Sequence, residues 1–293
     1  MPPSPAARAR ALATLAALLV AAPAAAWFAE GHRRVATAAV GLLPAEVPES
    51  FRAGAAAVSE AAVDPDLWKA RDAPALADRE WPEHFLDLEL LAGDEPPARR
   101  SDYLRWLFGR GLEAQRAGLL RHAIVEGSER LALCFAEQRR WPAEAAIAEK
   151  CRVYAGWLAH YAADLEQPLH TTIHHDGWAL PSGEPPFTGI HQRIDALFER
   201  VAFDAASSLA GVELRRIVEL GPAVAAELAA SHALIDAVYA LEPRLDDELG
   251  VADPQVVAFT CARYRAAARF VAELFLWSWE RSAEIELPSW LER

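Results

Sequence analysis

Two histidine–aspartate pairs with the same spacing are the features of this sequence best suited to chemistry. His160 and Asp164 lie four residues apart in an apolar, helix-like stretch, and His191 and Asp195 repeat that spacing after a loop. Residues at i and i+4 project from one face of a helix, so each pair can direct an imidazole and a carboxylate to one point. A single pair would equally suit a buried hydrogen bond. His170 lies between the two pairs, however, and the set indicates a metal-ligand scaffold.

Further residues of the same types lie upstream. Asp64 and Asp66 directly precede a helix-like segment, His84 follows a loop, and His32 lies near the start of the chain. Neutral imidazole and carboxylate suit Zn²⁺, and helix bundles commonly collect such ligands from several helices. The spacing leaves the choice between Asp64 and Asp66 open.

The first 26 residues have the layout of a secretory signal. Arg8 and Arg10 precede an apolar run, which ends in a proline and three alanines. We therefore expect a cleaved signal at residues 1–26, one domain at residues 27–293, and a secreted or periplasmic protein. Cleavage would give Trp27 a free α-amine, whose reference pKa of roughly 7.7–8.0 lets a metal displace its proton at modest cost.

The elements that must position these residues are predicted to be helices. Alanine, leucine, glutamate and arginine dominate, while proline and glycine cluster in a few breaks. Segments 101–137, 143–165 and 254–282 have the length and apolar recurrence of core helices. The longest break, near residues 176–189, interrupts the histidine-rich region. We predict an all-α fold, a single multi-helix domain with a zinc cluster in a cleft between helices.

Charge and cysteine content exclude some classes of function. The formal net charge of −13 provides no basic stripe for binding phosphate backbones, so an anionic substrate would need a local positive charge. The three cysteines, Cys134, Cys151 and Cys261, match no common cysteine-based zinc site. They allow at most one internal disulfide, and the sequence does not select a pair.

In chain order, nine residues resemble the ligands of the trinuclear-zinc phosphodiesterase superfamily. That superfamily contains the zinc-dependent phospholipases C and the single-strand-specific nucleases of the S-one/P-one type. The matching positions are Trp27, His32, Asp66, His84, His160, Asp164, His170, His191 and Asp195. The C-terminal helices are compatible with the resemblance but do not contribute to it.

The resemblance implies three zinc ions and their ligands. One zinc would be held by Asp66, His84, His160 and Asp164. A close neighbour would be held by His32, by the amine and carbonyl of Trp27, and by the other oxygen of Asp164. The third would lie on His170, His191 and Asp195. Asp66 and Asp164 are then the catalytic carboxylates, and a hydroxide activated by the paired zincs attacks phosphorus.

The resemblance also implies where a substrate binds. Phe85 could stack on a nucleobase, and Asp87 could accept its hydrogen bonds. Apart from the resemblance, Lys69 lies one helical turn after Asp66 and could reach the phosphate, although its spacing also suits a solvated surface lysine. The partners would be single-stranded nucleic acid or nucleotides, or alternatively a phospholipid head group. No protein partner is implied.

The branch of the superfamily stays open between two enzymes. The spacing from Trp27 to His32 and the aspartate at position 195 resemble the nucleases. Residues 176–178 and 189–191 differ from the usual nuclease loop and leave phospholipase C as the alternative. A further alternative from another class is a non-catalytic metal- or lipid-binding module. We expect a single-strand-specific endonuclease acting on DNA or RNA.

Overall fold

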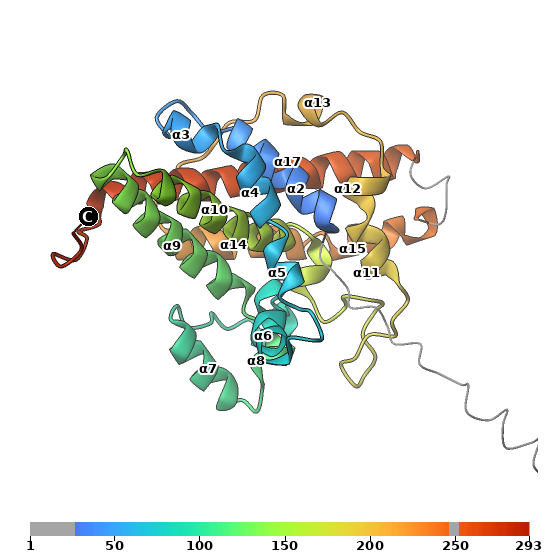
Figure 1. Ribbon diagram of the computed structural model, residues 1–293. Coiled ribbons are helices and arrows are strands. Elements are labelled where there is room, and N and C mark those ends of the chain that lie inside the picture. The colour runs from blue at the N-terminus through green and yellow to red at the C-terminus, as the bar shows by residue number, and fades with distance from the viewer. Residues whose placement is uncertain (1–26, 246–251, 293) are drawn as a thin grey trace, which may run out of the picture.

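Helices provide the regular structure of this chain in the computed structural model, which describes residues 27–245 and 252–292 (Figure 1). Within these ranges the β-type pairings are two isolated bridges, Leu86 with Gly118 and His175 with Gly177. The prediction of an all-α, multi-helix domain is confirmed. The predicted signal at residues 1–26 lies outside the described residues.

Long helices surround one continuous hydrophobic core. Helix α10 packs against α9, α4, α17 and α2, so it lies at the centre of the bundle (Figure 1). The bundle helices are α2 (Ala29–Gly41), α4 (Ala55–Ala61), α9 (Leu120–Arg140), α10 (Ala145–Leu165), α14 (Leu220–His232) and α17 (Pro254–Arg281). Two of the three predicted core helices, 143–165 and 254–282, therefore correspond to α10 and α17.

The third predicted core helix, segment 101–137, is divided in the structure. It forms α7 (Arg100–Phe108), the short α8 (Ala114–Ala117), and most of α9. Gly118 ends α8 with φ +87°, a conformation that L side chains rarely adopt. A Cβ at this position would also collide with the Phe85 carbonyl, which accepts a hydrogen bond from the first residue of α9. The break thus lets the chain that follows His84 pass close to the bundle.

Shorter elements surround the end of α10 that carries His160 and Asp164. They are α5 (Asp64–Leu67), α6 (Pro74–Glu80), η1 (Trp81–His84), η2 (Leu88–Leu91), η3 (Pro168–Thr171) and α11 (Ile190–Asp195). The remaining elements are α3 (Glu49–Arg52), α12 (Leu197–Arg200), α13 (Ala205–Leu209), α15 (Ile235–Leu241), η4 (Glu242–Arg244) and η5 (Ser282–Glu284).

Helix α17 begins with a capped first turn. Asp253 accepts a hydrogen bond from the Gln255 amide (2.8 Å), and Pro254 occupies the first turn of α17, where its missing N–H costs no hydrogen bond.

By length and mean hydropathy (1.4) the stretch Leu220–Arg244 would also pass as a membrane span. Core helices share those properties, so this is weak evidence for a span.

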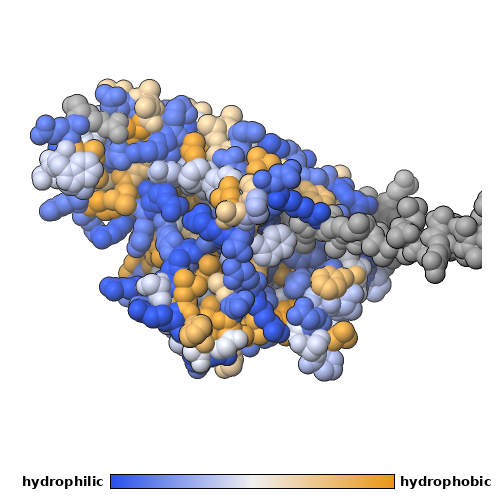
Figure 2. All heavy atoms as spheres, turned by 60° about the horizontal axis from the view of Figure 1, so that its bottom comes forward, coloured by the Kyte–Doolittle hydropathy of each residue, from blue (hydrophilic) through white to orange (hydrophobic). Residues whose placement is uncertain are grey.

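The surface is mostly hydrophilic on the face shown in Figure 2, with hydrophobic residues in separate patches. Large exposed apolar side chains include Phe108 at the end of α7 (86% exposed), and Trp178 (49%) and Phe187 (65%) in the loop before α11. Single exposed apolar residues are common on proteins and need no partner. The two in the loop lie close to the site described below.

Gly156 sets the approach of α10 to α4, and its substitution is a test of that packing. A Cβ at Gly156 would lie 2.5 Å from the Ala61 Cβ and 2.6 Å from the Val58 carbonyl oxygen. We expect Gly156→Ala to lower the free energy of unfolding by about 1–3 kcal/mol, because the helices must move apart. Denaturant unfolding measures this. Gly41→Ala is the control, since nothing lies within 4 Å of its new methyl group; an equal loss there would contradict the packing argument.

Candidate metal centre

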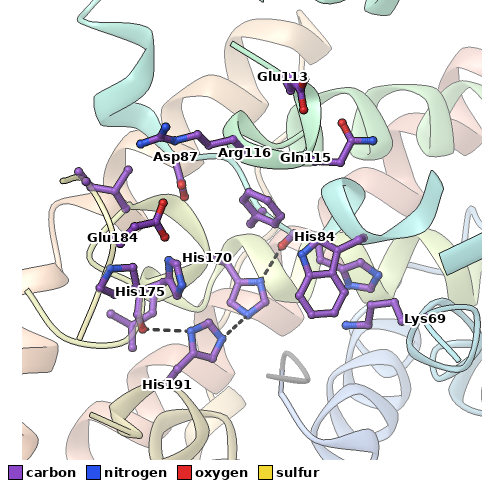
Figure 3. A pocket seen from close by; sticks show the side chains of 16 residues that line it. Lys69, His84, Asp87, Glu113, Gln115, Arg116, His170, His175, Glu184 and His191 are labelled. Atoms are coloured by element: carbon purple, nitrogen blue, oxygen red, sulfur yellow. Dashed lines mark hydrogen bonds between the residues drawn. The ribbon is translucent and has the colours of Figure 1, made fainter. Parts of the chain in front are cut away.

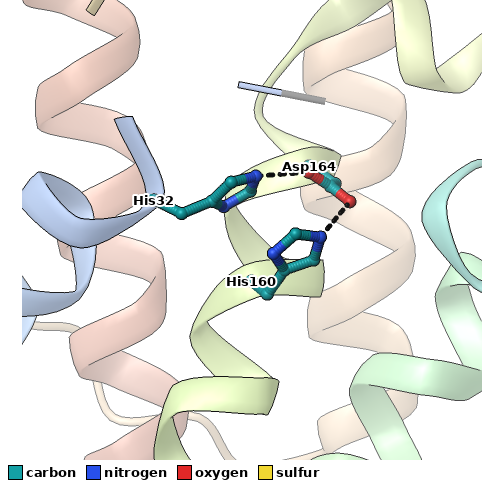
Figure 4. Close-up of side chains that lie close together, drawn as sticks. All are labelled: His32, His160 and Asp164. Carbon is teal, nitrogen blue, oxygen red and sulfur yellow. Dashed lines mark ion pairs between the residues drawn. The ribbon is translucent and has the colours of Figure 1, made fainter. Parts of the chain in front are cut away.

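The Asp164 carboxylate is the centre of the site. It lies one turn after His160 on α10 and is fully buried. Its Oδ1 is 3.3 Å from Nε2 of His32, which comes from α2 (Figure 4). Its Oδ2 is 2.9 Å from Nδ1 of His84 and 3.3 Å from Nε2 of His160. One carboxylate thus offers each oxygen to a different set of imidazoles.

Asp66 belongs to a second group around the same helix. It lies within 4.8 Å of ligand atoms of His84 and His160, and its Oδ1 is 3.8 Å from Nε2 of His160. Asp64 is directed elsewhere, because its Oδ2 accepts a hydrogen bond from the indole of Trp157 (2.9 Å). Since His160 is shared with the group of His32 and Asp164, two metal positions would be neighbours.

The third group consists of His170, His191 and Asp195. Nε2 of His191 lies 3.1 Å from Nε2 of His170 (Figure 3). The same Nε2 lies 3.4 Å from Oδ2 of Asp195. Nδ1 of His170 donates to the His84 carbonyl (2.6 Å), and Nδ1 of His191 donates to the His175 carbonyl (3.1 Å). Both neutral rings therefore point Nε2 lone pairs at each other.

Two facing lone pairs cannot hydrogen bond to each other, so a cation between them resolves the contact. Zinc bonds of roughly 2.0–2.1 Å at a tetrahedral angle would separate two ligand nitrogens by about 3.4 Å. The observed 3.1 Å is close to that spacing. The donor set and its geometry therefore fit a metal ion.

Hydrogen bonds behind the ligands hold their orientation. Nδ1 of His160 donates to the Ala62 carbonyl (2.8 Å), as the rings of the third group do with other carbonyls. Gln167 donates to Oδ1 of Asp195 (2.8 Å), which directs Oδ2 to His191. Such partners fix the tautomer and the ring plane of metal-binding histidines.

Burial leaves several polar atoms of these His/Asp groups without hydrogen-bond partners. Desolvation lowers the pKa of His32 and of His191 to about 3, so both rings are neutral. Burial raises the pKa of Asp164 and of Asp195 well above the ordinary range. Both nitrogens of His32, Oδ1 of Asp164 and Oδ2 of Asp195 are buried without a hydrogen-bond partner. Such orphaned atoms on one cluster are explained by a bound cation.

Trp27 is anchored beside the shared carboxylate. Its side chain is fully buried, its indole donates to the Ala163 carbonyl (2.9 Å), and its ring stacks on Phe198 (3.7 Å between centroids). Ala163 directly precedes Asp164, so the indole fixes the start of the described chain near the metal groups. Coordination by the α-amine stays a prediction, because it depends on cleavage before Trp27.

A cavity of about 410 Å³ adjoins the metal groups (Figure 3). His84, His170 and His191 line it, together with the three residues predicted to bind substrate, Lys69, Phe85 and Asp87. The sequence analysis missed the rest of the lining, which includes Trp81, Glu113, Gln115, Arg116, His175 and Glu184. These residues lie on short helices and loops without any regular spacing that would have identified them.

Lys69 and Asp87 are both buried at this cavity. Nζ of Lys69 is 2.7 Å from Oδ1 of Asp66, and only 7% of the Lys69 side chain is exposed. Burial raises the pKa of Asp87 well above its ordinary value, and Glu89 adds to the effect. Burial therefore favours the protonated form of the Asp87 carboxyl, which can donate a hydrogen bond as well as accept one.

Glu80 is a further residue that the sequence analysis missed. Its buried carboxylate accepts a hydrogen bond from the Tyr161 hydroxyl, and its Oε1 lies 3.5 Å from Nε2 of His84. It can therefore orient His84 from the side opposite Asp164. The signal was present, since Glu80 and His84 are four residues apart, but a 3₁₀ segment begins between them.

A scan against protein-family models and a search of curated proteins found no match to this chain. The superfamily resemblance therefore rests on the nine sequence positions. The structure brings the side chains of eight of them into three groups that could hold metal ions. The ninth, Trp27, is packed against α10.

The two neighbouring aspartates allow a matched test of the metal centre. We expect Asp66→Asn to weaken binding of one zinc ion by more than about 100-fold, because changes outside the ligand set alone typically cost about 10–100-fold. Asp64→Asn should leave zinc affinity unchanged, since this carboxylate contacts Trp157. Titration of chelator-stripped protein with Zn²⁺ against a competing indicator gives both values. The reverse order of effects would assign the ligand to Asp64.

Proposed function

We propose that this chain is a zinc-dependent phosphodiester hydrolase that cleaves single-stranded nucleic acid. The observation that supports it most is that residues of two of the three metal-ligating groups line one cavity, and the third group shares His160 with one of them. The same cavity is lined by the largely buried Lys69, the Phe85 ring and the buried Asp87 carboxyl. The proposal includes export of the chain and cleavage before Trp27.

Nitrogen and oxygen donors make zinc the expected metal. When bound, zinc supplies Lewis acidity, neutralisation of phosphate charge and an activated water. Asp164 can serve two neighbouring positions, since each of its oxygens faces a different imidazole set. The hydrogen bonds from His160 and His191 to backbone carbonyls keep Nε2 of each ring free for the metal.

Lys69 would hold the phosphate of the substrate. Its ammonium lies against Asp66 at the edge of the cavity and 5.5 Å from the Trp81 ring centroid. A metal ion on Asp66 would compete for the same carboxylate. The ammonium could then bind a phosphoryl oxygen and offset charge that develops there.

Phe85 and Asp87 favour a nucleobase as the group beside that phosphate. A ring face on Phe85 allows stacking with any base, and a protonated Asp87 can donate to a base nitrogen or carbonyl. Both residues line the same cavity as the ligand histidines. A base bound there would leave its phosphate near the metal groups.

Phospholipase C is the second candidate, and the loop before α11 favours it. Trp178 and Phe187 are exposed in this loop, whose residues 183–185 line the cavity. Apolar side chains near a metal site would suit contact with a lipid surface. The substrate would then be a phospholipid head group. The third reading is a metal- or lipid-binding module without turnover.

Assays of product release distinguish these three candidate functions. Protein beginning at Trp27 should release nucleotides from single-stranded DNA and RNA, and a chelator should abolish the release. Asp164→Asn should lower this rate by about three orders of magnitude or more, because one carboxylate serves two metal positions. A melting curve of the variant checks that it is folded.

Other results would reject the nuclease. A zinc-loaded preparation that releases diacylglycerol from phospholipid vesicles but no nucleotides would identify the phospholipase. Bound zinc with no turnover of either substrate would support the non-catalytic module.

The base-binding role of Phe85 and Asp87 has its own test. We expect Phe85→Ala and Asp87→Asn each to raise KM for single-stranded DNA by about 10-fold or more, since stacking on an aromatic ring contributes about 1–3 kcal/mol per base. Hydrolysis of bis(p-nitrophenyl) phosphate, which has no base, should change little. An equal loss on both substrates would mean that the variants disturb the metal centre instead.

A further inference from the structure

The backbone of residues 174–177 holds one face of the third metal group. The carbonyl of His175 accepts the Nδ1 hydrogen bond of His191 (3.1 Å), and the side chain of Asp176 accepts one from the His191 amide (3.4 Å). The orientation of the His191 ring therefore depends on where these four residues lie. They begin the long loop between η3 and α11.

Tyr239 clamps this segment from α15. Its hydroxyl donates to the His174 carbonyl (2.5 Å) and accepts from the Gly177 amide (2.9 Å). These two contacts lie on either side of His175 and Asp176. The conformation between them is specific to glycine at one end, because Gly177 has φ +104°.

Aromatic and hydrogen-bond contacts complete the clamp. Trp178 stacks on the Tyr239 ring, with centroids 4.4 Å apart and planes 26° apart. The Ala179 amide donates to Nδ1 of His174 (2.9 Å). The ring of Tyr239 and its hydroxyl thus make separable contributions: the ring packs on Trp178, and the hydroxyl fixes the two backbone groups beside His175.

We propose that Tyr239 is a positioning residue for the third metal site. Its hydroxyl holds the His174 carbonyl and the Gly177 amide, and these two contacts fix the backbone at His175 that lies between them. The His175 carbonyl in turn fixes His191 in the tautomer and ring plane that would present Nε2 to a metal. The chain of contacts runs from α15 through the loop backbone to a ligand, without Tyr239 touching the metal. This inference rests only on the metal-binding part of the proposed function.

A second contact between the region of α15 and the chain around the third metal group provides a control. Arg193, on α11, pairs with Glu242, which follows α15, at 3.0 Å and partly exposed to solvent. This ion pair joins the region of α15 to α11, and it includes neither the Tyr239 hydroxyl nor the His175 carbonyl. A general loosening of α15 would follow from losing either tie, whereas loss of His191 orientation would follow only from losing the hydroxyl.

The test compares Tyr239→Phe with Glu242→Gln in protein that begins at Trp27. Tyr239→Phe keeps the ring that stacks on Trp178 and removes both hydrogen bonds. We expect this substitution to lower the affinity of one of the three zinc sites by about 10–100-fold and to leave the affinities of the other two sites unchanged. Glu242→Gln should keep all three affinities. Loading with Co²⁺ gives a second readout, because the visible absorption of a single centre should change in Tyr239→Phe.

Several outcomes would overturn the inference. Equal affinities in Tyr239→Phe and the unmodified chain would remove the role of the hydroxyl. An equal loss in Glu242→Gln, or a parallel loss at all three sites, would assign the effect to general destabilisation. Fewer than three bound metals in the unmodified chain would remove its premise. Absence of nucleotide release with intact zinc binding would reject the nuclease alone and leave the role of Tyr239 standing.

Discussion

The burial of the Asp164 carboxylate among neutral imidazoles is the constraint on which the site depends. Desolvation disfavours both a charged carboxylate and charged imidazoles, and Oδ1 of Asp164 and both nitrogens of His32 are buried without hydrogen-bond partners. An uncompensated charge in a protein interior is costly unless it is paired or coordinates a metal. The His/Asp groups of this chain therefore make sense as a preformed binding site for cations.

The helix bundle provides the rigidity that such a site needs. Helix α10 carries His160 and Asp164 and is surrounded by other helices of the core. Gly156 allows α4 to approach α10 closely, and the chain that leaves α4 leads directly to Asp66. Ligands from the short elements are then held by backbone hydrogen bonds, which turn each ring towards a shared point. Stability of the bundle and geometry of the site are thus coupled.

The cavity would allow this acidic protein to bind the anionic substrate that we propose. The net charge of −13 opposes binding of a phosphodiester to the general surface. Three zinc ions would add about six positive charges at one place, beside the ammonium of Lys69. Recognition would then be confined to the cavity.

Local sequence patterns determined the helices and the main ligand pairs. The apolar recurrence predicted α10 and α17 closely, because their core-facing positions repeat with the helical period. The spacing of His160 with Asp164 and of His191 with Asp195 likewise depends only on that period. Segment 101–137 was predicted as one helix because its apolar pattern continues through glycines. The positive φ at Gly118 and its contact with Phe85, which no local pattern reveals, divide it.

The tertiary structure decided everything that depends on residues far apart in the chain. Asp64 and Asp66 are equivalent by sequence, and the distance to Trp157 or to His160 distinguishes them only after folding. Tyr239 acts on a loop more than 60 residues earlier, and such a contact leaves no periodic trace. Helix period fixes which side chains share a face, whereas packing between elements fixes which faces meet. The sequence alone therefore determined the types of the candidate ligands and the helical frame, and the fold decided how these residues converge into three groups.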